Sequence, residues 1–138
     1  MFVKDAMNKK VFYFEETQKI SIADILGLEK IRNIPVVNKN FQLVGLITHR
    51  ELLNTLAKKT DNVPVKEIMI SEVMKIGPDI PLKGAIDIMI ANKFGSLPVV
   101  DKTGKLIGIL TETDLLHILF EMIKLPDEYY PKLKEAQL

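Results

Sequence analysis

The pattern of hydrophobic and polar positions occurs twice along this chain. Residues 31–56, IRNIPVVNKNFQLVGLITHRELLNTL, align without a gap with residues 94–119, FGSLPVVDKTGKLIGILTETDLLHIL. Ten of the 26 aligned pairs are identical, and most of the others keep their polarity. Upstream, VKDAM at residues 3–7 aligns with VKEIM at residues 65–69, at an offset one residue shorter. The repeat predicts two units and a tail, at residues 1–60, 61–125 and 126–138.

Each unit shows the same order of elements. PVV is a short apolar strand, NKNF or DKTG is a turn in which Gly104 suits a positive φ, and LVGLI or LIGIL is a strand that we expect to be buried on both faces. A helix follows that strand, and another precedes PVV, begun by Pro81 or capped by Ser21. A further short strand is expected near residues 11–14 and 73–76. Because apolar strands need helices to cover them, the predicted fold class is mixed α/β (α+β), with both units in one core.

Composition and charge exclude several classes of protein. The chain has 138 residues, a net charge of +1 and no cysteine, so we expect no disulfide, thiolate chemistry or strong attraction to nucleic acid. No apolar run approaches the length of a membrane span, and the N-terminus lacks the apolar core of a signal peptide. A cytoplasmic protein is the default expectation.

Most catalytic signatures are absent from the sequence. It contains no phosphate-binding loop of the GxxxxGK[ST] type, no GxGxxG and no GxSxG. His49 and His117 are the only histidines, and they do not occupy equivalent positions of the repeat. Two histidines without cysteine make a structural zinc site improbable, so we expect no metal, no cofactor and no enzyme activity.

The strand-to-helix junctions, G-x-x-T-x-x-[DE], allow two interpretations. Thr48 with Glu51, and Thr111 with Asp114, have the spacing of a capping box that only starts a helix. The glycine also lets another group approach the strand, and a helix start favours an anion such as phosphate. Asp114 is shorter than Glu51, so we expect it to reach back to the cap less well and to be available to a ribose diol. Both interpretations stay open at this point.

The double unit resembles a tandem pair of CBS domains, the family named after cystathionine β-synthase. The resemblance is carried by IPVVNKNFQLVGLITHREL, LPVVDKTGKLIGILTETDL and VKEIM, and it covers nearly all of residues 1–125. It implies two β-α-β-β-α motifs related by a pseudo-twofold axis, with packed sheets and two clefts between them. It also implies homodimers that bind adenosine compounds, sense cellular energy and regulate an attached or partner protein.

Carried over by position, the resemblance implies a ligand site in the second copy. Asp114 holds the ribose and Thr111 approaches the phosphate. The other implied residues line the same cleft, Ile109 lies against the base, and two come from the first strand of the other unit: Ser96, Leu97, Pro98, Ile109, Lys10 and Val11.

The first copy implies a second, weaker cleft. Thr48 matches the family pattern, but Glu51 departs from it, which puts ribose binding in doubt. Arg50 is a candidate contact for phosphate. The residues before the strand complete this cleft: Arg32, Asn33 and Ile34.

Two functions follow as alternatives. The first is a stand-alone regulatory module that binds AMP, ADP, ATP or S-adenosylmethionine and acts on an unknown partner protein in trans. The second is a structural dimerisation module whose clefts are empty or filled by side chains such as Met7, Phe12 and Met74. The tail, with Tyr129, Tyr130 and Leu133, is expected to pack on its own domain or on a second subunit.

Overall fold

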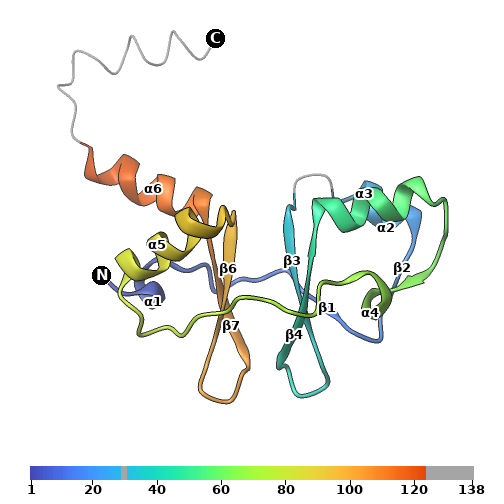
Figure 1. Cartoon of the computed structure of the whole chain (residues 1–138), viewed down its shortest axis with the longest axis horizontal. Helices are drawn as coiled ribbons and strands as arrows, with labels where there is room; N and C mark the ends of the chain where they lie inside the picture. Colours follow the sequence, from blue (N-terminus) through green and yellow to red (C-terminus); the bar gives the residue numbers. More distant parts are fainter. Residues whose placement is uncertain (29–30, 124–138) are drawn as a thin grey trace, which may run out of the picture.

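Two lobes lie side by side in the computed structural model, which describes residues 1–28 and 31–123 (Figure 1). A β-hairpin forms the inner side of each lobe. In the first lobe β3 (Asn33–Val37) pairs with β4 (Leu43–Thr48), and in the second lobe β6 (Ser96–Val100) pairs with β7 (Leu106–Thr111). These four strands confirm the sequence prediction. The predicted packing of the tail falls on residues 126–138, outside the described residues.

Helices cover the hairpins as the apolar periodicity predicts. The first lobe carries α2 (Ile22–Leu26) and α3 (His49–Ala57), and the second carries α5 (Leu82–Asn92) and α6 (Glu112–Met122). Ser21 caps α2 by accepting a hydrogen bond from the amide of Asp24, as its position suggests. The alternation of mixed strands and helices confirms the predicted fold class.

The first strand, expected near residues 11–14, forms in one lobe only, and there it begins at residue 14. In the first lobe, β1 (Phe14–Glu15) adds to β3 in parallel, and the amide of Glu16 donates to the carbonyl of Val37. In the second lobe Ile76 makes a single parallel bridge to Val99. The residue equivalent to Glu16 is Pro78, which has no N–H to continue the ladder. The strand expected near residues 73–76 is therefore reduced to one bridge.

The first residues of each repeat pack on the opposite lobe. The short helix α1 (Val3–Ala6) joins the core of the second lobe, and α4 (Val65–Ile68) joins the core of the first (Figure 1). Val3 and Val65 are fully buried there. The strand β5 (Val63–Pro64) directly precedes α4, and it pairs antiparallel with β2 (Lys19–Ile20). The two lobes are therefore interlocked by these exchanged segments.

A methionine follows each exchanged helix and lies against the glycine of the opposite strand. Met7 packs on Gly108, and Met69 packs on Gly45. Beside the first contact, Asn8 and Ile109 exchange backbone hydrogen bonds of 2.9 and 3.0 Å. The sequence predicts that something approaches these glycines, and the structure shows a methionine from the other repeat.

Replacing Gly108 with alanine is expected to destabilise the protein by about 1–3 kcal/mol, the usual cost of overpacking. A Cβ there would lie 2.6 Å from Met7 Sδ and 3.1 Å from the carbonyl oxygen of Asn8. Urea denaturation measures the effect, with Gly77→Ala as the control because nothing lies within 4 Å of its added Cβ. Equal stabilities for the two variants would contradict the close packing.

The tips of the two hairpins join the lobes. The amide of Leu43 donates to the carbonyl of Gly104 at 3.0 Å, and the amide of Leu106 donates to that of Phe41 at 3.1 Å. Gly104 has a φ of 85°, as predicted, while Phe41 takes the equivalent left-handed position with a φ of 61°. The side chain of Thr103 and the amide of Lys105 donate to Asp101, which lowers the pKa of its carboxyl. The hairpin tips are thus joined by two backbone hydrogen bonds between the lobes.

Candidate functional site

Both strand-to-helix junctions are capping boxes. The amide and hydroxyl of Thr111 donate to Oδ2 of Asp114 at 3.0 and 2.8 Å. The amide and hydroxyl of Thr48 donate to Oε1 of Glu51 at 2.9 and 2.8 Å. The expectation that Asp114 reaches back less well is therefore wrong. The extended backbone of each threonine directs its amide and hydroxyl toward the third helical residue. The side chain of either Asp or Glu at that position is therefore long enough to accept both hydrogen bonds.

The capping hydrogen bonds use only one of the two carboxylate oxygens of Asp114. Its three hydrogen bonds with Thr111 use Oδ2 and the backbone amide, and Oδ1 accepts none from the described residues. The side chain is half-buried. The carboxylate therefore starts the helix with one oxygen and has the other left for a further donor.

A cleft of about 360 Å³ lies at the start of α3 and a larger one of about 600 Å³ at the start of α6. We name them the Thr48 cleft and the Thr111 cleft. One wall of each cleft is the segment that follows an exchanged helix: residues 8–12 after α1 in the Thr111 cleft, and residues 70–74 after α4 in the Thr48 cleft. The Thr111 cleft is lined by Asn8, Lys10, Val11, Phe12, Ile31, Arg32, Asn33, Gly95, Ile109, Thr111, Glu112, Thr113 and Leu116. The Thr48 cleft is lined by Asn33, Leu46, Thr48, Arg50, Glu51, Ile70, Glu72, Val73, Met74, Lys93, Phe94, Gly95, Ser96 and Pro98.

The residues at the starts of the PVV strands line the other cleft than the sequence predicts. Ser96 and Pro98, assigned from the sequence to the cleft of Asp114, line the Thr48 cleft instead. Arg32 lines the Thr111 cleft instead of the first-copy cleft, and Asn33 lines both. The reason is that the two hairpins face each other, so the strand start of one lobe lies opposite the helix start of the other.

Two further assigned side chains do not reach a cleft. Leu97 is 1% exposed within the core of the second lobe, and Ile34 is fully buried in the core of the first. Side chains alternate along a strand, so these residues point inward where their neighbours Ser96 and Asn33 reach a cleft. Likewise β4 is not buried on both faces as expected, because Val44 and Leu46 are half-exposed and Leu46 lines the Thr48 cleft.

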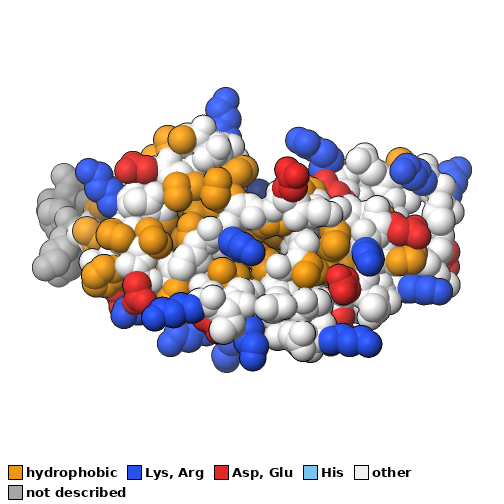
Figure 2. Space-filling model, turned by 60° about the horizontal axis from the view of Figure 1, so that its bottom comes forward, with side chains coloured by type: hydrophobic (Ala, Val, Ile, Leu, Met, Phe, Trp, Pro, Cys, Tyr) orange, Lys and Arg blue, Asp and Glu red, His pale blue; other side chains and the backbone are white. Residues whose placement is uncertain are grey.

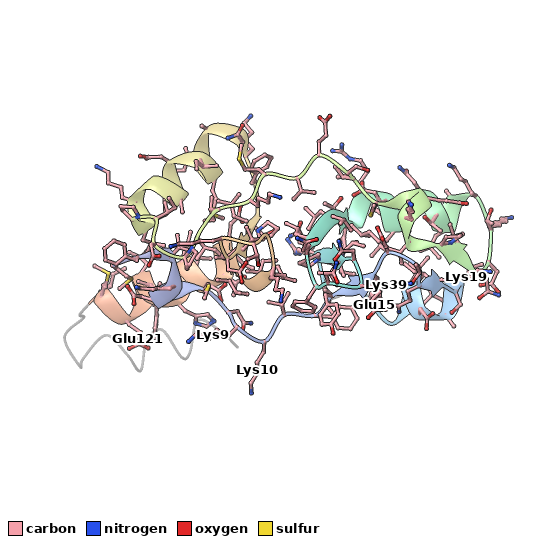
Figure 3. All side chains as sticks on the ribbon, turned by 90° about the horizontal axis from the view of Figure 1, so that it is seen from below. Lys9, Lys10, Glu15, Lys19, Lys39 and Glu121 are labelled. Atoms are coloured by element: carbon pink, nitrogen blue, oxygen red, sulfur yellow. The ribbon has the colours of Figure 1, made fainter. Side chains whose placement is uncertain are left out.

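All but one of the remaining assigned residues line the cleft to which the sequence assigns them. Lys10, Val11, Ile109 and Thr111 line the Thr111 cleft, whereas its lining does not include Asp114, whose carboxylate accepts a hydrogen bond from Thr111. Arg50 lies with Thr48 and Glu51 in the other cleft. Lys10 is exposed, and its side chain extends away from the body of the protein, so it borders the rim (Figure 3).

A family model supplies the decisive comparison: the CBS domain model matches the chain twice, at residues 3–58 and 65–121. The chain belongs to the CBS domain family. It is 32% identical over 121 residues to a homoserine O-acetyltransferase of Methanohalobium evestigatum, covering 87% of this chain but 24% of that enzyme. The chain thus spans about a quarter of that relative. The resemblance concerns its CBS part alone, and CBS pairs are regulatory modules, not enzymes.

Solved structures show the same fold. The CBS pair resembles the structure of CBSX2 in complex with AMP, with a TM-score of 0.72 and 28% identity, covering 88% of this chain and 97% of that one. It equally resembles the CBS pair of protein MJ0100 in complex with 5′-methylthioadenosine and S-adenosylmethionine. There the TM-score is 0.72 and the identity 28%, covering 89% and 98% of the two chains.

Several cleft residues of this CBS pair escaped sequence reasoning. Glu112 and Thr113 line the Thr111 cleft and directly follow Thr111, so the predicted helix start could have identified them as cleft residues. Lys93 precedes the strand of the second lobe but lines the Thr48 cleft, and Gly95 lines both clefts. Phe12 and Met74, proposed as fillers, line the clefts yet are each 47% exposed, and Met7 packs on Gly108. The clefts are therefore open.

One buried hydroxyl marks the Thr48 cleft. Ser96 is 6% exposed, and its Oγ has no hydrogen-bond partner among the described residues. A buried hydroxyl left unpaired costs about 1–3 kcal/mol, which a ligand that bonds to it removes. The Nε2 of His49 is the other such atom in the described part, in an apolar groove between α2 and α3.

Charges of both signs are interspersed on the face seen in Figure 2. The clefts also have charges of both signs: Lys10, Arg32 and Glu112 line the Thr111 cleft, and the Thr48 cleft is lined by Arg50, Lys93, Glu51 and Glu72. Within the described residues no helix is long and apolar enough to cross a membrane, and no group of three or more His, Asp or Glu residues suits a metal ion.

Proposed function

We propose that this CBS pair binds an adenosine nucleotide in the Thr111 cleft and thereby regulates a partner protein in trans. The observation that carries the proposal is Oδ1 of Asp114, which accepts no hydrogen bond from the described residues. It belongs to the helix start whose Thr111 lines a cleft of about 600 Å³. A carboxylate oxygen accepts from a ribose hydroxyl, and a helix N-terminus favours phosphate. Neither feature alone specifies a nucleotide, but both belong to the helix start at Thr111, which lines one cleft.

Each part of the ligand has a partner in this cleft. The amide of Glu112 donates to the carbonyl of Gly95, and that of Asp114 donates to Thr111, so the amide of Thr113 remains for phosphate. Lys10 and Arg32 add positive charge. The base has apolar neighbours on both sides of the cleft, at Ile109, Val11 and Phe12.

The structural neighbours support an adenosine ligand. CBSX2 was solved with AMP, and the CBS pair of MJ0100 was solved with 5′-methylthioadenosine and S-adenosylmethionine. The adenosine group is common to these molecules. We therefore place adenosine first among the candidate ligand groups and leave the number of phosphates to experiment.

The helices support a homodimer and a protein partner. A row of large apolar side chains is exposed along α6 and one stands on α5: Leu116, Leu119, Phe120, Met122, Ile123 and Ile90. Large apolar side chains exposed in number on one helix are typical of protein contacts. The same surface also supports the alternative, a dimerisation module without a ligand, so binding must be measured directly.

Isothermal titration of ligand-stripped protein with AMP, ADP, ATP and S-adenosylmethionine tests the proposed function. We expect heat with at least one of them, and loss of that heat when Arg32→Ala and Lys10→Ala are combined if a phosphate is bound. Absence of heat with all four ligands would falsify the proposed function and favour the dimerisation module.

A further inference from the structure

A pocket outside both clefts lies in the first lobe, and we name it the Thr55 pocket. Its volume is about 320 Å³, close to that of the Thr48 cleft. One side is a face of α3 that carries Glu51, Asn54, Thr55 and Lys58 at helical spacing. The other side is formed by β5 and α4, which lie in the same lobe (Figure 1). Of the residues that line the pocket only Glu51 also lines a cleft, so the pocket is a separate site.

Charges of both signs line this pocket without pairing with each other. Lys58 and Glu67 are exposed, and Glu51 uses only Oε1 for its cap. Among the described residues the one ion pair joins Lys4 to Asp79, so Lys58 forms none. The cation and the two carboxylates therefore line one pocket while remaining too far apart to form an ion pair. A ligand that carries both charges can bridge this gap.

The hydroxyl of Thr55 adds a buried acceptor to the pocket. Thr55 is 4% exposed, and its Oγ1 donates to the backbone carbonyl of Glu51 at 2.8 Å. Since the only proton of that hydroxyl is used, its oxygen is left to accept a hydrogen bond. Oε2 of Glu51 also accepts none from the described residues. Two acceptors one helical turn apart suit a group with several N–H donors, such as an ammonium group.

The second lobe lacks this combination of residues. When the repeats are aligned, Thr55 corresponds to Ile118, which packs against the core of the second lobe, and Lys58 corresponds to Glu121. A hydroxyl is thus buried where the other repeat has an apolar side chain, and a cation stands where the other repeat has a carboxylate. Neither change is needed for the fold, because α6 forms the equivalent helix without them. The polar character of the Thr55 pocket is therefore specific to the first repeat.

From these contacts we infer that the Thr55 pocket binds a small aliphatic α-amino acid. The ammonium group of the amino acid binds the two carboxylates and the hydroxyl of Thr55, and its carboxylate pairs with Lys58. Val63 of β5 is buried and Ile68 of α4 is half-buried, and both line the pocket, so they contact the aliphatic side chain. The site uses both charges of the ligand, which distinguishes an amino acid from an amine or a carboxylic acid.

Isothermal titration of ligand-stripped protein with L-valine, L-leucine and L-methionine tests the inference. We expect one site per chain for at least one of them, with a dissociation constant of about 1 mM or below. The N-acetyl and amide derivatives of the best ligand each lack one of its charges. They are expected to bind at least about tenfold more weakly, because each loses a hydrogen-bonded charge. Glycine, which lacks the aliphatic side chain, is also expected to bind more weakly.

Variants of the exposed charges locate the binding site. Lys58→Gln and Glu67→Gln are each expected to lower the affinity about fivefold, the upper range for an ion pair that solvent reaches. Lys59→Gln is the matched control, because Lys59 is also exposed but does not line the pocket. Thr55→Val keeps the shape of the side chain and removes the hydroxyl, and it is expected to weaken binding as well.

Two results would overturn the inference. The first is an absence of heat with all three amino acids up to about 10 mM. The second is equal affinity for the best amino acid and its blocked derivatives, or equal binding by Lys58→Gln and Lys59→Gln. Neither result bears on the proposed function, because nucleotide binding in the Thr111 cleft is measured separately on the same protein.

Discussion

Deleting residues 1–7 is expected to destabilise the second lobe selectively, by about 3–5 kcal/mol. Val3 is fully buried in the core of that lobe, and its burial alone is worth about 1.5–3 kcal/mol. Its amide donates to the carbonyl of Ile80, and the carbonyl of Met1 accepts from the amide of Leu82, both at 2.9 Å. The deletion also removes Met7 from Gly108. The expected loss is a large share of the stability of an ordinary domain, about 5–15 kcal/mol.

Hydrogen exchange resolved by segment measures this selectivity. We expect the amides of β7 and α6 to lose protection first, while those of β3 and β4 keep theirs. Val3→Ala and Val65→Ala form a matched pair, since each residue is fully buried in the lobe opposite to its own repeat. Lys4→Ala serves as the control, because its 3.0 Å bridge to Asp79 is exposed and is worth little. Equal loss of protection in both lobes from either valine variant would contradict the exchange of segments.

The sequence predicts most of the fold because the information it uses is local. Alternating polarity, Gly104 in its turn and the threonine caps each depend on a few neighbouring residues, and all appear in the structure. The exchange of α1 and α4 is different. The repeat of VKDAM in VKEIM shows that these segments are equivalent, but an apolar residue such as Val3 fits the core of either lobe. Only the connection between the lobes decides where it packs.

The clefts were predicted less well for the same reason. Aligning the repeats groups Ser96 with Thr111 and Arg32 with Thr48, because Ser96 pairs with Thr111 across one hairpin and Asn33, the residue after Arg32, pairs with Thr48 across the other. The clefts form between hairpins, so Arg32 meets Thr111 and Ser96 meets Thr48. Arg50 and Glu51, which follow Thr48, were assigned to the correct cleft because a helix start belongs to one lobe. The cleft composition therefore depends on the packing of two units, which neither repeat encodes alone.

The carboxylates at the two helix starts give the most direct test of the site. Asp114→Ala is expected to lower nucleotide affinity at least about tenfold, because it removes a charged hydrogen-bond acceptor worth about 1.5–3 kcal/mol. Glu51→Ala is expected to change affinity less, because Glu51 lines the Thr48 cleft, whereas Asp114 is hydrogen-bonded to Thr111, which lines the Thr111 cleft. Both variants lose a capping box and about 1 kcal/mol of stability.

Because Asp114→Ala and Glu51→Ala each remove one capping box, each variant controls for the loss of stability in the other. Thermal denaturation without ligand is expected to show similar losses for Asp114→Ala and Glu51→Ala, so a difference in titration reports on binding and not on the cap. Asp114→Asn refines the comparison, because its amide keeps one acceptor oxygen for Thr111 and loses the charge. We expect its affinity to fall nearly as far as that of Asp114→Ala, with less loss of stability. A larger loss of affinity in Glu51→Ala than in Asp114→Ala would contradict this assignment. The nucleotide site would then be the Thr48 cleft, where the hydroxyl of Ser96 has no hydrogen-bond partner among the described residues.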